Sequence, residues 1–233
     1  MRLSSNPGRK AQKKRVSNFE ILLNESARVH GHLCPGQVLG VRMALYGLAG
    51  VGITDPKGKD RKKLLLIVEI DRCATDALQS VTGCSLGKRS MKFMDYGKMA
   101  ATFANLETGE ALRVVAKEEA REKAMEYFPD IQDKYACQTE AYRVMPDEEL
   151  FYSEPVRIKI PEDEMPGARP GRARCERCGE WFYLRKGHCT HLCRACRKGS
   201  YYQKSGPIGQ AHSPMTVQSP DSSAEWTCLR QEK

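Results

Sequence analysis

The apolar positions of the first seventy residues predict two helices and then a buried strand. A capping box at Ser17–Glu20 precedes a run of apolar residues and favours a helix from 18 to about 29. A second helical repeat of apolar residues follows Pro35, which suits the first position of a helix, and ends near Gly50. The continuous apolar run over 64–70 indicates a strand buried on both faces of a sheet.

Shorter elements fill the next ninety residues. A brief helix over 75–81 is followed by alternating apolar stretches that read as strands, and the predicted strands lie at 91–94, 99–106 and 111–116. Two helices and a late strand follow at 118–128, 131–144 and 151–160. We therefore expect an α+β domain with a mixed sheet over residues 17–165.

Both ends of the chain have the composition of disordered segments. Residues 1–16 carry six basic and no acidic groups and offer little to bury, so they predict a disordered basic tail. A Pro/Gly linker at 161–171 separates the main domain from a small one at 166–200, and the polar residues 201–233 predict a second disordered tail.

The most specific motif is a pair of cysteine knuckles in the small domain. Cys175-x-x-Cys178 and Cys193-x-x-Cys196 are separated by 14 residues, a spacing that places four thiolates around one Zn²⁺ ion. A segment this short has too little core to fold alone, so the metal would supply the missing stability. We predict a four-cysteine zinc ribbon whose closed site is structural. His188, Cys189 and His191 also lie between the knuckles; one of them could replace a ligand, but extra residues in such a loop are more often solvated.

The ribbon is also basic and contains aromatic residues. Residues 166–204 carry ten basic and two acidic groups, while the whole chain has a net charge of +9. Such a surface can bind single-stranded nucleic acid through phosphate contacts and stacking, with the basic N-terminal tail assisting. The alternative is a solvated surface on which Trp181, Phe182 and Tyr183 form the small core of the ribbon, and we favour that alternative for the three aromatics.

A second group of cysteines and histidines lies in the main domain. In an extended segment His30, His32 and Cys34 share one face, and Cys34 sits at the start of a helix, where a thiolate is favoured. Cys73 follows the central strand, and Cys84 follows the next short helix. If these side chains meet, they form an open N/S site for zinc or another transition metal; otherwise the thiols are buried apolar residues and the histidines lie on the surface.

The composition of the chain also predicts the cellular compartment in which its cysteines act. No run of 18 apolar residues and no secretory signal are present, so we expect a cytoplasmic protein with no membrane span. Thiols stay reduced in that compartment, and ten cysteines there favour metal ligands over disulfides.

Three segments resemble the FmdE-like family of formylmethanofuran dehydrogenase proteins, whose longer members also carry a C-terminal zinc ribbon. The segments are His30–Gly36, Cys73–Lys88 and Asp95–Ala100. The resemblance spans roughly residues 18–198. It departs from the family pattern at Arg89-Ser90, where a Gly-Asn pair is expected.

The resemblance to the FmdE-like family adds expectations about the fold, the oligomeric state and the site that the spacing of the cysteines alone does not give. It implies an α-β-α-β-β-β mixed sheet resembling the catalytic domain of glyceraldehyde-3-phosphate dehydrogenase, and a homodimer. It also implies a groove of shared residues that bind metal or act in catalysis. In this chain the candidates are His32, Cys34, Cys73, Cys84 and Asp76, with Gln79, Thr82 and Lys88 as candidate cofactor-binding residues nearby.

Three functions are compatible with these observations. The first is a metal-binding accessory protein of one-carbon or molybdenum/tungsten enzyme metabolism, in which Cys34 and Cys73 are ligands or nucleophile, His32 is ligand or base, and Asp76 orients a ligand. The second is a nucleic-acid-binding regulator that uses the basic ribbon. The third is a zinc-stabilised scaffold that docks on a larger metalloenzyme complex. Whether the chain itself catalyses a reaction is left open.

Overall fold

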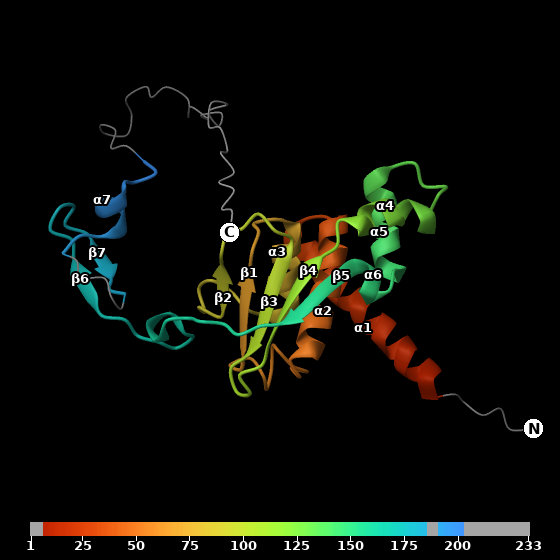
Figure 1. The fold of residues 1–233 in the computed structure, drawn as a ribbon, viewed down its shortest axis with the longest axis horizontal. Helices are drawn as coiled ribbons and strands as arrows, with labels where there is room; N and C mark the ends of the chain where they lie inside the picture. The colour runs from red at the N-terminus through yellow and green to blue at the C-terminus, as the bar shows by residue number, and fades with distance from the viewer. Residues whose placement is uncertain (1–6, 186–190, 203–233) are drawn as a thin grey trace, which may run out of the picture. The chain divides into compact units, whose positions relative to one another are not determined.

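The computed structural model describes residues 7–185 and 191–202, with side chains from Asn18 onward (Figure 1). The described residues divide into two compact units, one of residues 7–172 with 183–185 and one of residues 173–182 with 191–202. The division passes through both strands of one short hairpin. The boundaries expected at 165 and 200 stay a prediction.

A five-stranded sheet forms the centre of the first unit. Its order is β2-β1-β3-β4-β5; β1 and β2 are parallel, and the other neighbours are antiparallel. The sheet is therefore mixed, which confirms the predicted α+β class. The strands are β1 (Leu64–Val68), β2 (Met91–Phe93), β3 (Ala100–Asn105), β4 (Ala111–Ala116) and β5 (Phe151–Pro155).

Strand β1 explains the continuous apolar run in the sequence. Leu66 is paired with Met91 of β2 on one side and with Phe103 of β3 on the other, so the strand has no free edge. Successive side chains of a strand point to opposite faces. Leu64, Leu66 and Val68 accordingly join the main core, while Leu65 joins a smaller apolar cluster. Because both faces of β1 are buried, both need apolar residues. The strand therefore lacks the alternation of apolar and polar residues that is typical of a strand with one face in solvent.

Helices supply the rest of the main core. They are α1 (Pro7–His30), α2 (Pro35–Gly50), α3 (Cys73–Thr82), α4 (Glu119–Tyr127), α5 (Lys134–Val144) and α6 (Asp147–Leu150), with a short 3-10 turn at Glu162–Glu164. The predicted start of α1 at residue 18 is wrong. The helix begins at Pro7, so it includes residues 7–16 of the segment expected to be disordered.

Two glycines let α2 and α3 approach closely. A Cβ atom on Gly40 would lie 2.6 Å from the carbonyl oxygen of Ala74, and one on Gly36 would lie 2.8 Å from the Cβ of Cys73. Both distances are too short for any other residue, so glycine is required for this backbone contact. The contact brings the first turn of α3 against the first turn of α2.

Arg42 of α2 fixes the end of α5. Its guanidinium donates to the carbonyl oxygens of Tyr142 (2.9 Å) and Met145 (2.8 Å) and pairs with Asp147 at 2.6 Å. The last carbonyls of a helix have no partner within the helix. Arg42 therefore caps α5 and joins it to α2.

The second unit has the elements of a ribbon. Two short strands that the division crosses, β6 (Arg172–Arg174) and β7 (Trp181–Tyr183), pair with each other, and a short helix α7 (Arg194–Lys198) follows. In the part of the chain that the structure describes, no helix is long and apolar enough to cross a membrane.

Candidate metal centres

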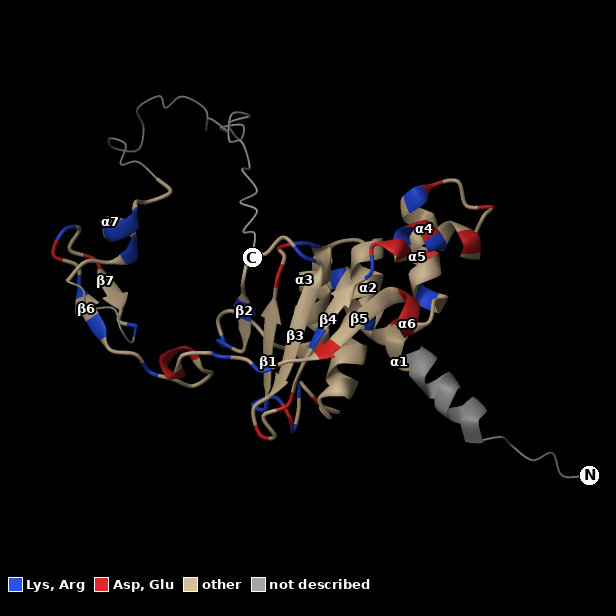
Figure 2. Cartoon of the chain, viewed as in Figure 1, with Lys and Arg blue, Asp and Glu red and all other residues tan. Residues whose placement is uncertain are grey.

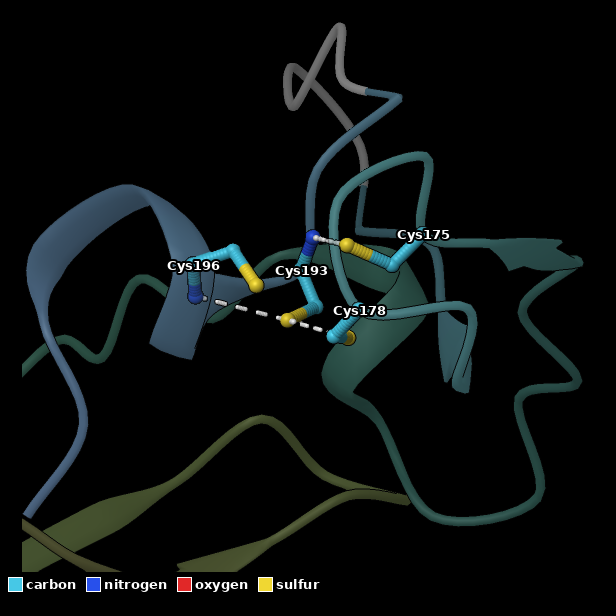
Figure 3. A group of neighbouring side chains, drawn as sticks. All are labelled: Cys175, Cys178, Cys193 and Cys196. Carbon is cyan, nitrogen blue, oxygen red and sulfur yellow. Dashed lines mark hydrogen bonds between the residues drawn. The ribbon is translucent and has the colours of Figure 1, made fainter. Parts of the chain in front are cut away.

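The four ribbon cysteines converge as their spacing predicts. The Sγ atoms of Cys175, Cys178, Cys193 and Cys196 all lie within 4.8 Å of one another (Figure 3). A tetrahedral zinc with Zn–S bonds of about 2.3 Å has Sγ–Sγ edges of about 3.8 Å. The Cys178–Cys193 Sγ separation is 3.8 Å, so the group fits a four-thiolate metal site.

Backbone N–H groups point at these sulfurs. The amide of Cys193 donates to the Sγ of Cys175 at 3.3 Å, and the amide of Cys196 donates to the Sγ of Cys193 at 3.4 Å. Amide bonds, foremost that from Cys178, lower the pKa of Cys175 to about 6. Desolvation, followed by the neighbouring thiols, raises the pKa of Cys196 to about 12. The opposite shifts arise from four thiols crowded around one point, and a bound divalent metal would favour the thiolate form of all four.

Of the three extra residues between the knuckles, the structure describes His191 alone, and its side chain is solvated as we favoured. Nδ1 of His191 pairs with the carboxylate of Glu176 at 3.1 Å on the surface, and His191 is not in the cysteine group. His188 and Cys189 lie outside the described residues.

A second group of ligands lies in the first unit. A ring nitrogen of His30 and the Sγ atoms of Cys34 and Cys73 lie within 4.8 Å of one another. They come from the end of α1, the residue that caps α2, and the first residue of α3. The structure thus brings together three residues that are spread over 44 positions of the sequence.

His30 has the arrangement expected of a metal ligand. Its Nδ1 lies 2.7 Å from a carboxylate oxygen of Asp76, whereas its Nε2 is buried and has no hydrogen-bond partner among the described residues. Buried polar atoms are normally paired, so such an atom calls for an explanation. Metal-binding histidines commonly give their other N–H to a carboxylate. An ion at Nε2 would complete this pattern.

The two cysteines occupy the starts of two helices. Cys34 is extended, with φ −149°, and precedes Pro35; Cys73 opens α3, and both are free thiols. Burial, followed by the charge of the adjacent Cys34, raises the pKa of Cys73. Two adjacent thiolates repel each other, and a bound cation would relieve that repulsion.

Buried Gln37 holds Cys73 in place and was not identified from the sequence. Its Nε2 donates to the backbone oxygen of Cys73 at 2.6 Å, and its Oε1 accepts from the hydroxyl of Ser26. The side chain is fully buried. The sequence did carry a signal for Gln37, which is a polar residue in an otherwise apolar helix. The Gly36-x-x-x-Gly40 spacing likewise indicated the close contact between α2 and α3.

Several predicted site residues lie elsewhere. Cys84 does not join the group, because its thiol is buried in the main core near the Leu64 carbonyl oxygen, at 3.9 Å. His32 is exposed and stacks on His30, with ring centroids 4.6 Å apart. The family resemblance pointed to His32, but the structure places His30 in the group.

Of the three candidate cofactor-binding residues, Thr82 and Lys88 form hydrogen bonds with the backbone, and Gln79 faces solvent. Thr82 donates to the Leu78 carbonyl at 2.6 Å, and its hydroxyl accepts from the amide of Cys84. Lys88 donates to the Gly83 carbonyl at 3.0 Å, and Gln79 is exposed. Their assignment as cofactor-binding residues stays a prediction.

An open cavity adjoins the second group. It has a volume of about 600 Å³ and includes Cys34, so it reaches one of the three ligands. The loop before α2 forms one wall and the start of α5 forms the other. Its lining residues are His32, Leu33, Cys34, Pro35, Asp133, Tyr135, Ala136, Thr139 and Glu140.

The fold and these two groups define a mixed α+β protein with two cysteine clusters able to hold metal. The model of the FmdE family, described as "FmdE, Molybdenum formylmethanofuran dehydrogenase operon", matches residues 29–152, which is more than half of the chain. The chain belongs to the FmdE family.

Two relatives illustrate the similarity. A crystal structure of a tungsten formylmethanofuran dehydrogenase FmdE-like protein from Syntrophus aciditrophicus superposes with a TM-score of 0.57 at 22% identity, covering 79% of this chain and 95% of that one. A "Probable S-adenosyl-L-methionine-binding protein" of Archaeoglobus fulgidus is 32% identical over 209 residues, which is 82% of this chain and 56% of that protein. This chain therefore spans about half the length of that relative. The likeness to glyceraldehyde-3-phosphate dehydrogenase stays a prediction.

Proposed function

We propose that this protein binds a transition metal, with zinc as the expected ion, through His30, Cys34 and Cys73. We further propose that it serves as an accessory to formylmethanofuran dehydrogenase-type or other molybdenum/tungsten enzymes of one-carbon metabolism. The observation that carries the proposal is the His30 ring, which is bonded to Asp76 on one side and, among the described residues, has a buried, unpaired Nε2 on the other. The family description, which refers to a formylmethanofuran dehydrogenase operon, supports the accessory role.

Each residue has a defined part in this proposal. Asp76 holds the proton at Nδ1 of His30, which leaves the Nε2 lone pair available to an ion. Gln37 holds the backbone of Cys73. His30, Cys34 and Cys73 would supply three ligands to a zinc ion, which would leave a fourth position open for water or a ligand and would provide Lewis-acid chemistry there. Exposed His32, on the wall of the cavity, is placed to exchange a proton with a molecule inside it.

Elemental analysis tests the metal assignment. We expect about two metal ions per wild-type chain, one in each cysteine group. Cys175→Ser with Cys178→Ser should remove only the ribbon ion, and Cys34→Ser with Cys73→Ser should remove only the other. Cys84→Ser is the matched control, because Cys84 is a main-domain cysteine outside the group.

One outcome of this experiment would contradict the metal assignment. If Cys34→Ser with Cys73→Ser folds, as shown by an unchanged circular dichroism spectrum, and still binds two ions, the assignment of His30, Cys34 and Cys73 is wrong. Cobalt substitution gives an independent reading, since Co²⁺–thiolate charge-transfer absorption should fall substantially in that variant while the ribbon's contribution remains.

Size-exclusion chromatography with light scattering tests the proposed partners. The purified chain should elute as the expected homodimer. It should co-elute with a formylmethanofuran dehydrogenase from the same organism if the accessory role involves a stable complex. Absence of co-elution together with no effect of the chain on the metal content of that enzyme would contradict the accessory role.

A second candidate function is the binding of a cationic nucleoside such as S-adenosylmethionine in the cavity beside Cys34. The name of the Archaeoglobus relative supports it, and so does the lining: Asp133 and Glu140 supply negative charge, and Tyr135 supplies an exposed aromatic ring. A volume of about 600 Å³ lies within the usual range for small-molecule sites.

Calorimetric titration separates this candidate from the first. S-adenosylmethionine should bind more tightly than S-adenosylhomocysteine, which lacks the sulfonium charge, and Glu140→Gln should reduce that preference. Absence of binding would contradict this candidate function, and equal binding of both compounds would contradict the recognition of the sulfonium charge by the acidic lining.

A further inference from the structure

The hairpin of the ribbon has one face built of paired arginines and aromatic rings. The amide of Leu184 bonds to the Gly171 carbonyl at 2.8 Å, and the amide of Cys175 bonds to the Glu180 carbonyl at 2.8 Å. These bonds fix the register of β6 and β7. Residues directly opposite each other point to the same face. The register therefore sets Arg172 opposite Tyr183 and Arg174 opposite Trp181, with all four side chains on one face.

The aromatic rings on this face are exposed and do not form the ribbon's core. Trp181 is 61% exposed and Tyr183 is 66% exposed, whereas Phe182 on the other face is half-buried. The expectation that all three aromatics form the core is therefore wrong for Trp181 and Tyr183. Exposed aromatic rings of this kind offer flat faces on which the bases of a nucleic acid can stack.

One arginine lies beside a ring, and the other is bonded to the turn of the hairpin. The Arg172 guanidinium lies 5.5 Å from the centre of the Tyr183 ring, and Arg174 donates to the Gly179 carbonyl at 2.8 Å. A guanidinium group stacks on a ring through its planar face and binds phosphate through its N–H edge. The two kinds of contact can therefore be made together.

Positive charge dominates the described part of the ribbon. Residues 166–185 and 191–202 contain eight basic and two acidic residues, and Figure 2 shows Lys and Arg along β6 and α7. One of the acidic residues, Glu176, is paired with His191. A partner that carries repeated negative charge would therefore complement this part of the chain.

We propose that this hairpin face binds single-stranded nucleic acid. Bases of the strand stack on Trp181 and Tyr183, and phosphates bind Arg172, Arg174 and neighbouring basic residues. A duplex hides the faces of its bases, so stacking favours unpaired strands. An acidic peptide carries negative charge but lacks the planar bases that can stack on two exposed rings.

Fluorescence anisotropy of a labelled twelve-nucleotide strand tests the proposal on the full zinc-loaded chain. We expect single-stranded RNA or DNA to bind at least tenfold more tightly than a duplex of the same length or a polyglutamate peptide. Comparison of the RNA and DNA arms shows which sugar is preferred. In a Trp226→Phe background, which leaves Trp181 as the chain's one tryptophan, the strand should also quench tryptophan emission.

Variants separate stacking from charge. Trp181→Ala with Tyr183→Ala should weaken binding by about thirtyfold or more, since each of the two stacked bases contributes about 1–3 kcal/mol. Arg172→Gln with Arg174→Gln should reduce the slope of log K against log salt by about 1.4. Tyr96→Ala and Arg121→Gln are controls, because these exposed residues lie outside the ribbon.

Zinc content must stay unchanged in each ribbon variant, which shows that the ribbon is intact. Equal affinity of the Trp181→Ala, Tyr183→Ala variant and wild type would overturn the proposal. Equal binding of duplex, polyglutamate and single strand would also overturn it, because it would show attraction by charge alone.

Discussion

Nδ1 of His30 lies 2.7 Å from a carboxylate oxygen of Asp76, although the two residues are 46 positions apart in the sequence. The imidazole is 14% exposed and the carboxylate 56% exposed. Water reaches the carboxylate, while the other edge of the ring faces the protein. The pair thus orients His30 from the solvent side and leaves the inner nitrogen for the metal group.

Replacement of Asp76 by Asn should lower metal affinity at the second group. An amide neither fixes the imidazole tautomer nor raises its basicity as a carboxylate does, so we expect a loss of about 10- to 100-fold. Competition with a chromogenic chelator measures the loss. Asp71→Asn is the control, since Asp71 is exposed just before α3. Equal losses in both variants, or none in Asp76→Asn, would contradict the role given to this pair.

A methyl group at Gly36 should disturb the same group through the backbone. The added Cβ would lie 2.8 Å from the Cβ of Cys73, so α2 and α3 must separate. Overpacking of this kind costs about 1–3 kcal/mol. Gly36→Ala should therefore lower both the melting temperature and the metal content of the second group. Gly87→Ala, whose Cβ would meet nothing within 4 Å, should change neither, and a tolerated Gly36→Ala would show that the contact is not required.

Loss of the Arg42 guanidinium should destabilise the first unit. Arg42→Met keeps most of the aliphatic stem but removes the donors to the Tyr142 and Met145 carbonyls and leaves Asp147 without its partner. We expect a decrease of about 2–4 kcal/mol in the free energy of unfolding by urea. Arg121→Met removes an arginine that is half exposed and should change stability by less than about 0.5 kcal/mol. A similar effect of both changes would contradict the capping role.

Tyr142 should make the protein less stable at high pH. Burial raises the pKa of its hydroxyl from 10.0 to about 12. Between these values the unfolded chain releases the proton and the folded chain keeps it, so stability falls as pH rises from 10 towards 12 and is fully present below 10. The loss amounts to about 2–3 kcal/mol. Urea unfolding from pH 9 to 11.5 should show a shallower decline for Tyr142→Phe than for wild type, and parallel curves would disprove the assignment.

The sequence correctly predicted those structural features that depend on a short stretch of the chain. The ribbon followed from four cysteines at fixed spacing, and the central position of β1 followed from its apolar run, because each signal lies within a short stretch of chain. The α-β-α-β-β-β order from α2 to β4 was also predicted correctly. The start of α1 was not, since polar and basic residues gave no apolar repeat to mark it.

The second metal group could be predicted only in part. Cys34 and Cys73 were identified from their positions at helix starts. The choice between His30 and His32 depends on how α1 ends against α3, and the exclusion of Cys84 depends on the core around Leu64. Contacts between distant segments decide both questions, and no spacing rule encodes them.

The two metal groups differ in how far their ligands are spread along the chain, and this difference determines when each becomes available. The ribbon's four sulfurs lie within residues 175–196, so an ion can be captured as soon as that stretch has been synthesised, and chelation should unravel it. His30, Cys34 and Cys73 converge only after three helices have docked on a core that is stabilised independently of any ion. The first unit can therefore stay folded while its group is empty, so of the two candidate groups this is the one that could release and regain an ion without unfolding.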